Sequence, residues 1–121
     1  MKTSKFIKNV VQWAEAKGFK KIRAKCIAYK TPTQFVRQGE EQAFVPDATG
    51  VLRGRKSYFE IALKTEDVRR RISKWKLLST MASMKGGKLF LFAPKGHKTF
   101  AEKIVKKHLL NAEVIYFKNL E

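Results

Sequence analysis

The sequence VPDATGVLRGRKSYFEIALK, residues 45–64, contains two apolar runs on either side of a turn at Gly54. Two runs joined by a glycine-centred turn predict a β-hairpin or a pair of adjacent strands. Asp47 lies in the first run and Glu60 in the second. A carboxylate inside an apolar run must be paired or hold a cation, unless it faces water. These two acids are therefore the first candidates for a functional site.

The spacing of apolar residues predicts the remaining elements. Helices are expected from Thr3 or Ser4 to Lys17, from a cap at Thr65 to the glycines at 86–87, and from the turn at 94–96 through Leu109; strands are expected at 22–29, 88–93 and 113–117. Residues 30–42 form a long connection. Strand, helix and strand in succession predict that the strands carrying Glu60 and Leu89 are parallel. We expect an α/β protein, with a single mixed β-sheet flanked by helices in the order α-β-β-β-α-β-α-β.

The length and charge of the chain indicate one basic domain. Its 121 residues suffice for a single domain, residues 1–121, with its own core. Lys and Arg number 27 against 10 Asp and Glu, which gives a formal net charge of +17. Such an excess favours a polyanionic partner, of which nucleic acid is the first candidate and an anionic membrane surface the second. We expect nucleic acid, DNA in preference to RNA. The alternative is a basic surface that serves only solubility.

The single cysteine, Cys26, has no partner for an internal disulfide, which favours a reducing, cytoplasmic location. No apolar run approaches the roughly 18 residues of a membrane span, and residues 1–8 lack the apolar stretch of a signal peptide. No membrane role is expected.

Basic residues gather in two places where phosphates could bind. The helix that follows Thr65 combines an apolar stripe with a basic outer face that includes Arg69, Arg70 and Lys74. The turn between the two apolar runs carries Arg53, Arg55 and Lys56. We expect both groups to contact nucleic acid, although a basic helix face is often only solvated.

The order of elements, with Asp47 after Pro46 and Glu60 thirteen residues later on the next strand, resembles the PD-(D/E)xK nuclease superfamily. The resemblance implies a restriction-endonuclease-like fold and hydrolysis of phosphodiester bonds in nucleic acid. It further implies Mg²⁺, or Mn²⁺, held by Asp47 and Glu60. The family's acid on the first helix would correspond to Glu15. Two carboxylates on adjacent strands suit such hard cations, which prefer oxygen ligands.

The chain departs from the family pattern at the lysine that follows the second acid by two residues, because Ala62 stands there. Lys64 lies two residues further and, if the strand continues, on the same face as Glu60. We therefore expect Lys64 to take the catalytic role. Lys56, four residues before Glu60, is a weaker substitute on that face.

Three interpretations follow. In the first, the site is an active nuclease centre. In the second, the site is catalytically inactive and the fold only binds nucleic acid. In the third, Asp47 caps a turn and Glu60 pairs with a basic residue of a neighbouring strand. An enzyme of another class is not supported. The glycines at 86–87 follow a helix and precede a strand, the reverse of the order in a phosphate-binding loop, and no Ser, Cys or Thr stands in the context of a nucleophile. A homodimer or a partner subunit is compatible with so small a domain.

Overall fold

The computed structural model describes residues 2–25, 35–36 and 43–117. Within these ranges the elements are α1 (Lys2–Lys17), β1 (Lys20–Ala24), β2 (Phe35–Val36), β3 (Ala43–Phe44), β4 (Ala48–Leu52), β5 (Arg55–Ile61), α2 (Val68–Met84), β6 (Gly86–Pro94), α3 (Lys98–His108) and β7 (Ala112–Phe117). The order matches the predicted one, with the short strands β2 and β3 in addition. Cys26 lies outside the described residues.

The main sheet is mixed, as predicted, and its described strands follow the order β1-β4-β5-β6-β7. β4 pairs antiparallel with β1 and with β5. β6 pairs parallel with β5 and with β7. The predicted parallel arrangement on either side of α2 is therefore confirmed. Strand β1 begins at Lys20, earlier than the predicted residue 22. β2 and β3 pair with each other, so the predicted connection at 30–42 is not wholly irregular.

The predicted turn at Gly54 is a two-residue hairpin turn, since Leu52 pairs with Arg55. Arg53 and Gly54 have φ angles of 53° and 78°. Positive φ at both central residues defines a type I′ turn, whose twist matches that of the flanking strands. This turn fixes the register in which β4 meets β5.

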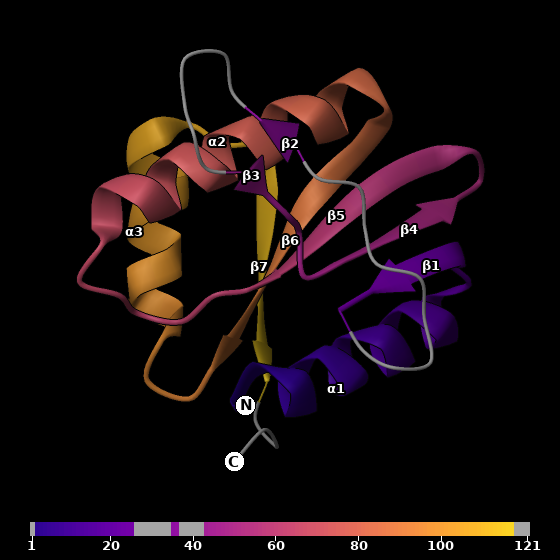
Figure 1. Ribbon diagram of the computed structural model, residues 1–121, viewed down its shortest axis with the longest axis horizontal. Helices are drawn as coiled ribbons and strands as arrows, with labels where there is room; N and C mark the ends of the chain where they lie inside the picture. Colours follow the sequence, from indigo (N-terminus) through magenta and orange to yellow (C-terminus); the bar gives the residue numbers. More distant parts are fainter. Residues whose placement is uncertain (1, 26–34, 37–42, 118–121) are drawn as a thin grey trace.

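Helices cover both faces of the sheet (Figure 1). On one face, α1 packs through Val10 and Ala14 against Phe59 and Phe92. On the other face, α2 covers β5 and β6, and α3 covers β6 and β7. Trp75 of α2 is fully buried there. Successive side chains of a strand point to opposite faces, so β5 contributes to both cores. Phe59 belongs to the α1 side, and Tyr58 and Ala62 belong to the α2 side.

The start of α2 differs from the prediction. Asp67, not Thr65, is the N-cap residue, and its Oδ1 accepts a hydrogen bond from the N–H of Arg70 at 3.3 Å. Thr65 lies in the preceding turn, where its Oγ1 accepts from the N–H of Asp67 at 3.1 Å. An aspartate is as good an N-cap as a threonine, and only Asp67 directly precedes the helix.

The junction from α2 into β6 depends on Gly87. A Cβ atom at this position would lie 2.0 Å from the carbonyl oxygen of Lys56. Glycine is therefore required for the close approach of β6 to the start of β5. The predicted end of α2 at the two glycines is correct within two residues, because the helix ends at Met84.

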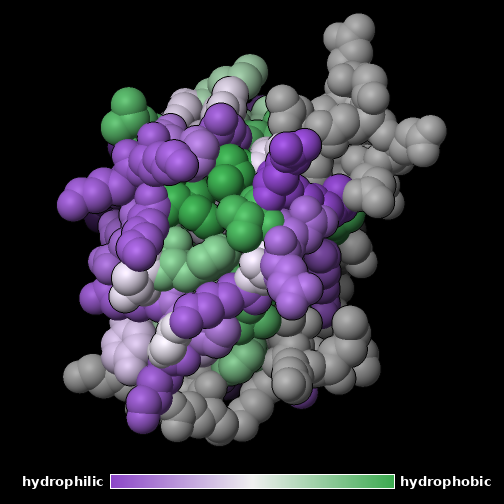
Figure 2. Space-filling view, turned by 90° about the vertical axis from the view of Figure 1, so that its left-hand side faces the viewer, coloured by the Kyte–Doolittle hydropathy of each residue, from purple (hydrophilic) through white to green (hydrophobic). Residues whose placement is uncertain are grey.

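Polar and charged side chains cover much of the side on which α3 and the start of α2 lie, and hydrophobic side chains reach the surface near its centre (Figure 2). Val68, at the start of α2, is 38% exposed. None of the helices in the described ranges is long and apolar enough to cross a membrane.

Candidate active site between the sheet and helix α2

Asp47 and Glu60 meet where the backbone pairing of β4 and β5 ends. The last backbone pair of the two strands on this side is Ala48 with Phe59. Beyond it, side chains replace the backbone partners. The N–H of Asp47 donates to Glu60 Oε2 at 2.8 Å, and the N–H of Ile61 donates to Asp47 Oδ2 at 2.8 Å. Each acid therefore receives a hydrogen bond from the backbone of the strand opposite.

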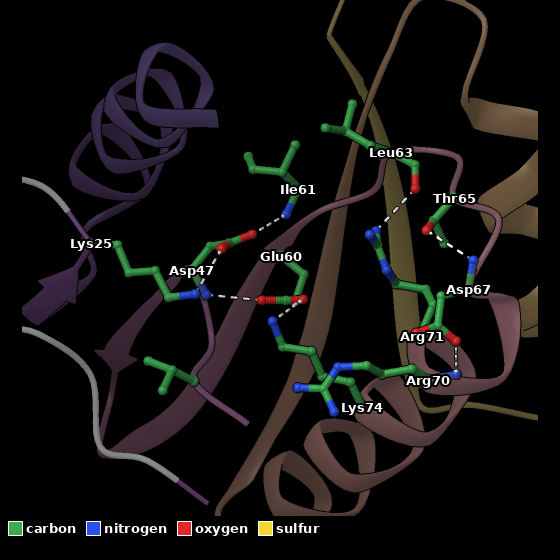
Figure 3. Close-up of a pocket in the computed structure, with 11 residues that line it drawn as sticks. Lys25, Asp47, Glu60, Ile61, Leu63, Thr65, Asp67, Arg70, Arg71 and Lys74 are labelled. Atoms are coloured by element: carbon green, nitrogen blue, oxygen red, sulfur yellow. Dashed lines mark hydrogen bonds and ion pairs between the residues drawn. The ribbon is translucent and has the colours of Figure 1, made fainter. Parts of the chain in front are cut away.

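Each of the two carboxylates also contacts a lysine. Lys25 follows β1, and its Nζ lies 3.5 Å from Asp47 Oδ1. Lys74, on α2, has its Nζ 3.0 Å from Glu60 Oε1. The two cations come from different elements: Lys25 reaches Asp47 from the end of the edge strand β1, and Lys74 reaches Glu60 from α2 (Figure 3). A carboxylate in an apolar setting needs such partners to remain charged.

Glu60 is the more deeply placed of the two acids, with only 2% of its side chain exposed. Burial, with a smaller effect of the negative charge of Asp47, raises the pKa of the Glu60 carboxyl to about 7. The contact with Lys74 and the N–H of Asp47 oppose this increase of the pKa. Near neutral pH, Glu60 is therefore poised between its protonated and charged forms.

A cleft of about 430 Å³ opens over the two acids. Its walls include Lys25, Arg70, Arg71 and Lys74, and the connection between β5 and α2 closes one end through Leu63 and Thr65. Arg71 Nη1 donates to the carbonyl oxygen of Leu63 at 2.9 Å, which ties that connection to the helix. The cleft thus combines an acidic floor with basic walls, an arrangement suited to a phosphate and a bound cation together.

The predicted catalytic lysine, Lys64, does not line this cleft. Strand β5 ends at Ile61, so the alternation that would place Lys64 beside Glu60 does not continue that far. The side chain of Lys64 is exposed, and its backbone N–H donates to His97 Nδ1 at 2.9 Å. The lysine that reaches Glu60 is Lys74.

Ala62, at the position of the family's lysine, is fully buried. It belongs to the core that α2 and α3 form on the sheet, together with Trp75 and Leu78. A lysine at this position would have to place its ammonium group among apolar side chains, at high cost.

Glu15, the predicted third metal ligand, lies on α1 and is exposed. The buried side of α1 packs against the face of the sheet that carries Phe59 and Ile61. Glu60 points to the other face, and Glu15 is not among the residues that line the cleft.

The predicted nucleic-acid-binding residues do not form one surface. Arg70 and Lys74 line the cleft, whereas Arg69 lines a separate groove beside α3 with Lys76 and His108. The other three predicted residues lie at the hairpin turn between β4 and β5. Arg53 and Arg55 are exposed there, and Lys56 is half-buried.

Sequence reasoning did not assign Lys25 or Arg71 to the site. Lys25 was visible only as part of the alternating basic pattern of its strand. Its contact with Asp47 follows from the register of β1 on β4, in which Ala24 faces Ala48. Arg71 is turned toward the sheet, where it also stacks over the ring of Trp75 with its Cζ 5.6 Å from the ring centre.

Asp47 and Glu60 are the residues of the cleft that could hold a divalent cation of the Mg²⁺ type. Within the described ranges, no group of three or more His, Cys, Asp or Glu residues is placed to hold a metal ion. Mg²⁺ commonly binds through one or two carboxylates, and water and substrate phosphates complete its coordination. Asp47 Oδ1 and Glu60 Oε1 are the oxygens that face lysines, and a cation would compete with those lysines for them.

Comparison of the chain with protein-family models, with curated proteins and with solved structures found no match.

Proposed function

We propose that this protein is a metal-dependent nuclease with a restriction-endonuclease-like fold, acting on phosphodiester bonds of DNA or RNA. The observation that carries the proposal is the pairing of Asp47 and Glu60 at the base of a basic cleft. The negative charge of Asp47 adds to the cost of ionising the buried Glu60 carboxyl. A buried carboxyl with a raised pKa in a cleft is typical of functional sites, where it binds a cation or transfers a proton.

The arrangement of the chain supports the same proposal. A helix on one face, an antiparallel hairpin bearing the two acids, and a helix that connects two parallel strands match the element order the sequence resemblance implies. The acids lie on neighbouring strands and share the cleft below α2. Asp47 lies immediately before β4, one residue outside the strand on which the resemblance implies the first acid.

In the proposed reaction, Asp47 and Glu60 would hold Mg²⁺ or Mn²⁺. A bound metal ion supplies an activated water and neutralises negative charge on the phosphate. Lys74 Nζ remains within the same cleft and donates hydrogen bonds to a phosphate oxygen or to the attacking water. Its side chain is only 19% exposed, so a charge there is less screened by solvent than at the surface.

Lys74 thereby takes the role that Lys64 was expected to fill. The reaction requires an ammonium group beside Glu60, and a lysine from any part of the chain can provide it. Lys74 satisfies the requirement from α2, at 3.0 Å from Glu60 Oε1. Lys25 provides a second ammonium group on the opposite wall, 3.5 Å from Asp47 Oδ1.

A second candidate is a nucleic-acid-binding module without catalysis. It is favoured by the present pairing of the acids, because both already have lysine and backbone partners. In that case the ion pairs of Lys25 with Asp47 and of Lys74 with Glu60 serve to hold β1, β4, β5 and α2 together. The basic walls of the cleft then bind phosphates without a metal ion. This arrangement resembles the third sequence interpretation, except that the partner of Glu60 comes from a helix and not from a strand.

A cleavage assay on labelled single-stranded and double-stranded DNA and RNA separates the two candidates. A nuclease cleaves at least one substrate in Mg²⁺ or Mn²⁺ and stops when the metal is chelated. Asp47→Asn should then abolish cleavage and leave binding intact, because the substitution preserves the shape of the side chain. Glu113→Gln, which changes a half-exposed carboxylate paired with Lys88, is the matched control. Binding without cleavage by the wild type would favour the second candidate.

A further inference from the structure

Three basic residues from separate segments of the chain lie, by strand register, at or beside the end of β5 near the hairpin turn, away from the cleft. Lys56 is at the start of β5, on the same face as Tyr58 and Glu60. Arg23 of β1 pairs with Thr49, which in turn pairs with Tyr58. Arg23 therefore lies level with Tyr58, two residues along β5 from Lys56, and on the same face of the sheet. Lys85 directly precedes Gly86, the partner of Lys56 on β6.

The surroundings of Lys56 concentrate positive charge. Its side chain is half-buried, and its Nζ lies 5.4 Å from the centre of the Tyr58 ring. Burial, followed by the charges of Arg23 and Lys85, lowers the pKa of Lys56. In the part of the chain that the structure describes, no ion pair joins any of these three side chains to a carboxylate.

Such an arrangement is unfavourable for the protein alone, because like charges repel, and the effect is greatest at the half-buried Lys56. An anion between the three cations would remove that repulsion. Phosphate is a suitable anion, since several cationic donors can share its oxygens. The cluster differs in this respect from Lys25 and Lys74, whose charges are already matched by Asp47 and Glu60.

We propose that Arg23, Lys56 and Lys85 form a second phosphate subsite, which binds the backbone of the nucleic acid at a distance from the carboxylate cleft. The proposal rests on nucleic-acid binding as set out under the proposed function, but not on hydrolysis. It adds a second contact for the substrate backbone near the hairpin turn, separated from the cleft by the buried Tyr58.

The length of β5 sets the spacing between the two places. Four residues separate Lys56 from Glu60, which corresponds to about 13 Å along a strand at roughly 3.3 Å per residue. The subsite therefore holds a phosphate of the same backbone other than the one at the bond in the cleft. A substrate with a single phosphodiester occupies only the cleft.

The test compares two variants that remove equal charge. One carries Arg23→Gln, Lys56→Gln and Lys85→Gln. The other carries Lys95→Gln, Lys103→Gln and Lys106→Gln, three exposed positions in and before α3. Both are titrated with a short fluorescently labelled DNA, single-stranded and double-stranded, in chelator so that no cleavage occurs. Thermal unfolding checks that each variant is folded, and Lys56→Gln alone serves if the triple variant is not.

We expect the cluster variant to bind roughly tenfold or more weakly than the wild type, and the control variant to be clearly less affected, because only the former removes a phosphate-binding group. The salt slope of log K should decrease by about 0.9 for each duplex phosphate that the variant no longer neutralises. Equal effects in the two variants would overturn the subsite and leave the proposed function intact. Wild-type protein that binds neither DNA nor RNA would overturn both. Cluster-dependent binding without cleavage would uphold the subsite and overturn only the nuclease.

A phosphodiester with a chromogenic leaving group adds a second readout if the wild type cleaves. The cluster variant should hydrolyse this single-phosphate substrate with an unchanged kcat/KM while its KM for longer DNA rises. A comparable decrease in kcat/KM on both substrates would show that the three residues act on the cleft itself, and would overturn a separate subsite.

Discussion

Asp47 and Glu60 are joined through backbone and side chain together: the N–H of Asp47 donates to Glu60 Oε2 at 2.8 Å. The residue after Glu60 returns the interaction, since the N–H of Ile61 donates to Asp47 Oδ2 at 2.8 Å. These two hydrogen bonds orient both carboxylates without a metal. The site is thus preorganised, and a cation would exchange with lysine ammonium groups and would not have to reorganise the strands.

The pKa of Glu60 should respond in opposite directions to its two neighbours. The carboxyl carbon of Glu60, followed by NMR as a function of pH, is expected to titrate near pH 7 in the wild type. Asp47→Asn should lower that midpoint because it removes a negative charge, and Lys74→Met should raise it because it removes a positive one. A wild-type midpoint near the usual value of about 4.3 would contradict the buried environment described for Glu60.

Stability should depend on pH through the same residue. The raised pKa means that the folded state retains the Glu60 proton between about pH 4.5 and pH 7, where the unfolded state has lost it. The free energy of unfolding therefore decreases across this window as the pH rises, and is constant with respect to Glu60 above it. The upper bound is on the order of 3 kcal/mol, at about 1.4 kcal/mol per pKa unit.

Denaturant unfolding of the wild type and of Glu60→Gln across this pH range isolates the effect. From pH 4.5 to pH 7, the unfolding free energy of the wild type should decrease relative to that of Glu60→Gln. If the unfolding free energies of the two proteins changed with pH in parallel, the ionisation of Glu60 would have no effect on stability, and the prediction would be wrong.

Lys74 is predicted to act in the reaction and Lys64 is not. If the wild type cleaves nucleic acid, Lys74→Gln should reduce kcat by about a hundredfold to a thousandfold, the range for removal of one donor to a developing charge. Lys64→Gln should have little effect, because its side chain is exposed outside the cleft.

Lys76→Gln, two residues further along α2 and in the groove beside α3, is the control for a change of charge on the helix. The ratio of kcat values for the Lys74 and Lys76 variants is the decisive quantity. A ratio near one would remove Lys74 from the mechanism.

Gly87→Ala should destabilise the protein, since the added Cβ would overlap the carbonyl oxygen of Lys56. Overpacking against backbone typically costs about 1–3 kcal/mol, and a contact this short puts the variant at the upper end. Denaturant titration measures the decrease in unfolding free energy. Gly96→Ala is the comparison, because a Cβ at Gly96 meets no atom within 4 Å, although its φ of +87° carries some strain. Equal decreases would contradict the close approach of β6 to β5.

The sequence was sufficient to predict that Asp47 and Glu60 face each other. A two-residue turn at Arg53 and Gly54 places Leu52 opposite Arg55, and counting back along both strands brings Asp47 opposite Glu60. The hairpin is a local structure, so turn type and hydrophobic pattern determine its register. The parallel pairing across α2 was predictable for a similar reason, since a strand, a helix and a strand have few arrangements.

The lysines of the site could not be predicted in this way. The contact of Lys74 with Glu60 depends on where the axis of α2 crosses the sheet, and this is set by packing of Trp75 and Leu78 on the other side chains of the core. The contact of Lys25 depends on the register of β1 against β4, which no short turn fixes. The error over Lys64 arose because the sequence pattern extended β5 past its end at Ile61.

Asp47 and Glu60 are proposed to form, together, the binding site for a divalent cation. Calorimetric titration of Mn²⁺ into the wild type, Asp47→Asn and Glu113→Gln, each with an oligonucleotide present, tests it most directly. Binding by the wild type and by the Glu113 variant, with none by the Asp47 variant, is the predicted result, and affinity should increase as the pH rises through 7 because protons compete for Glu60. Absence of binding to the wild type, or equal binding by all three proteins, would contradict the claim.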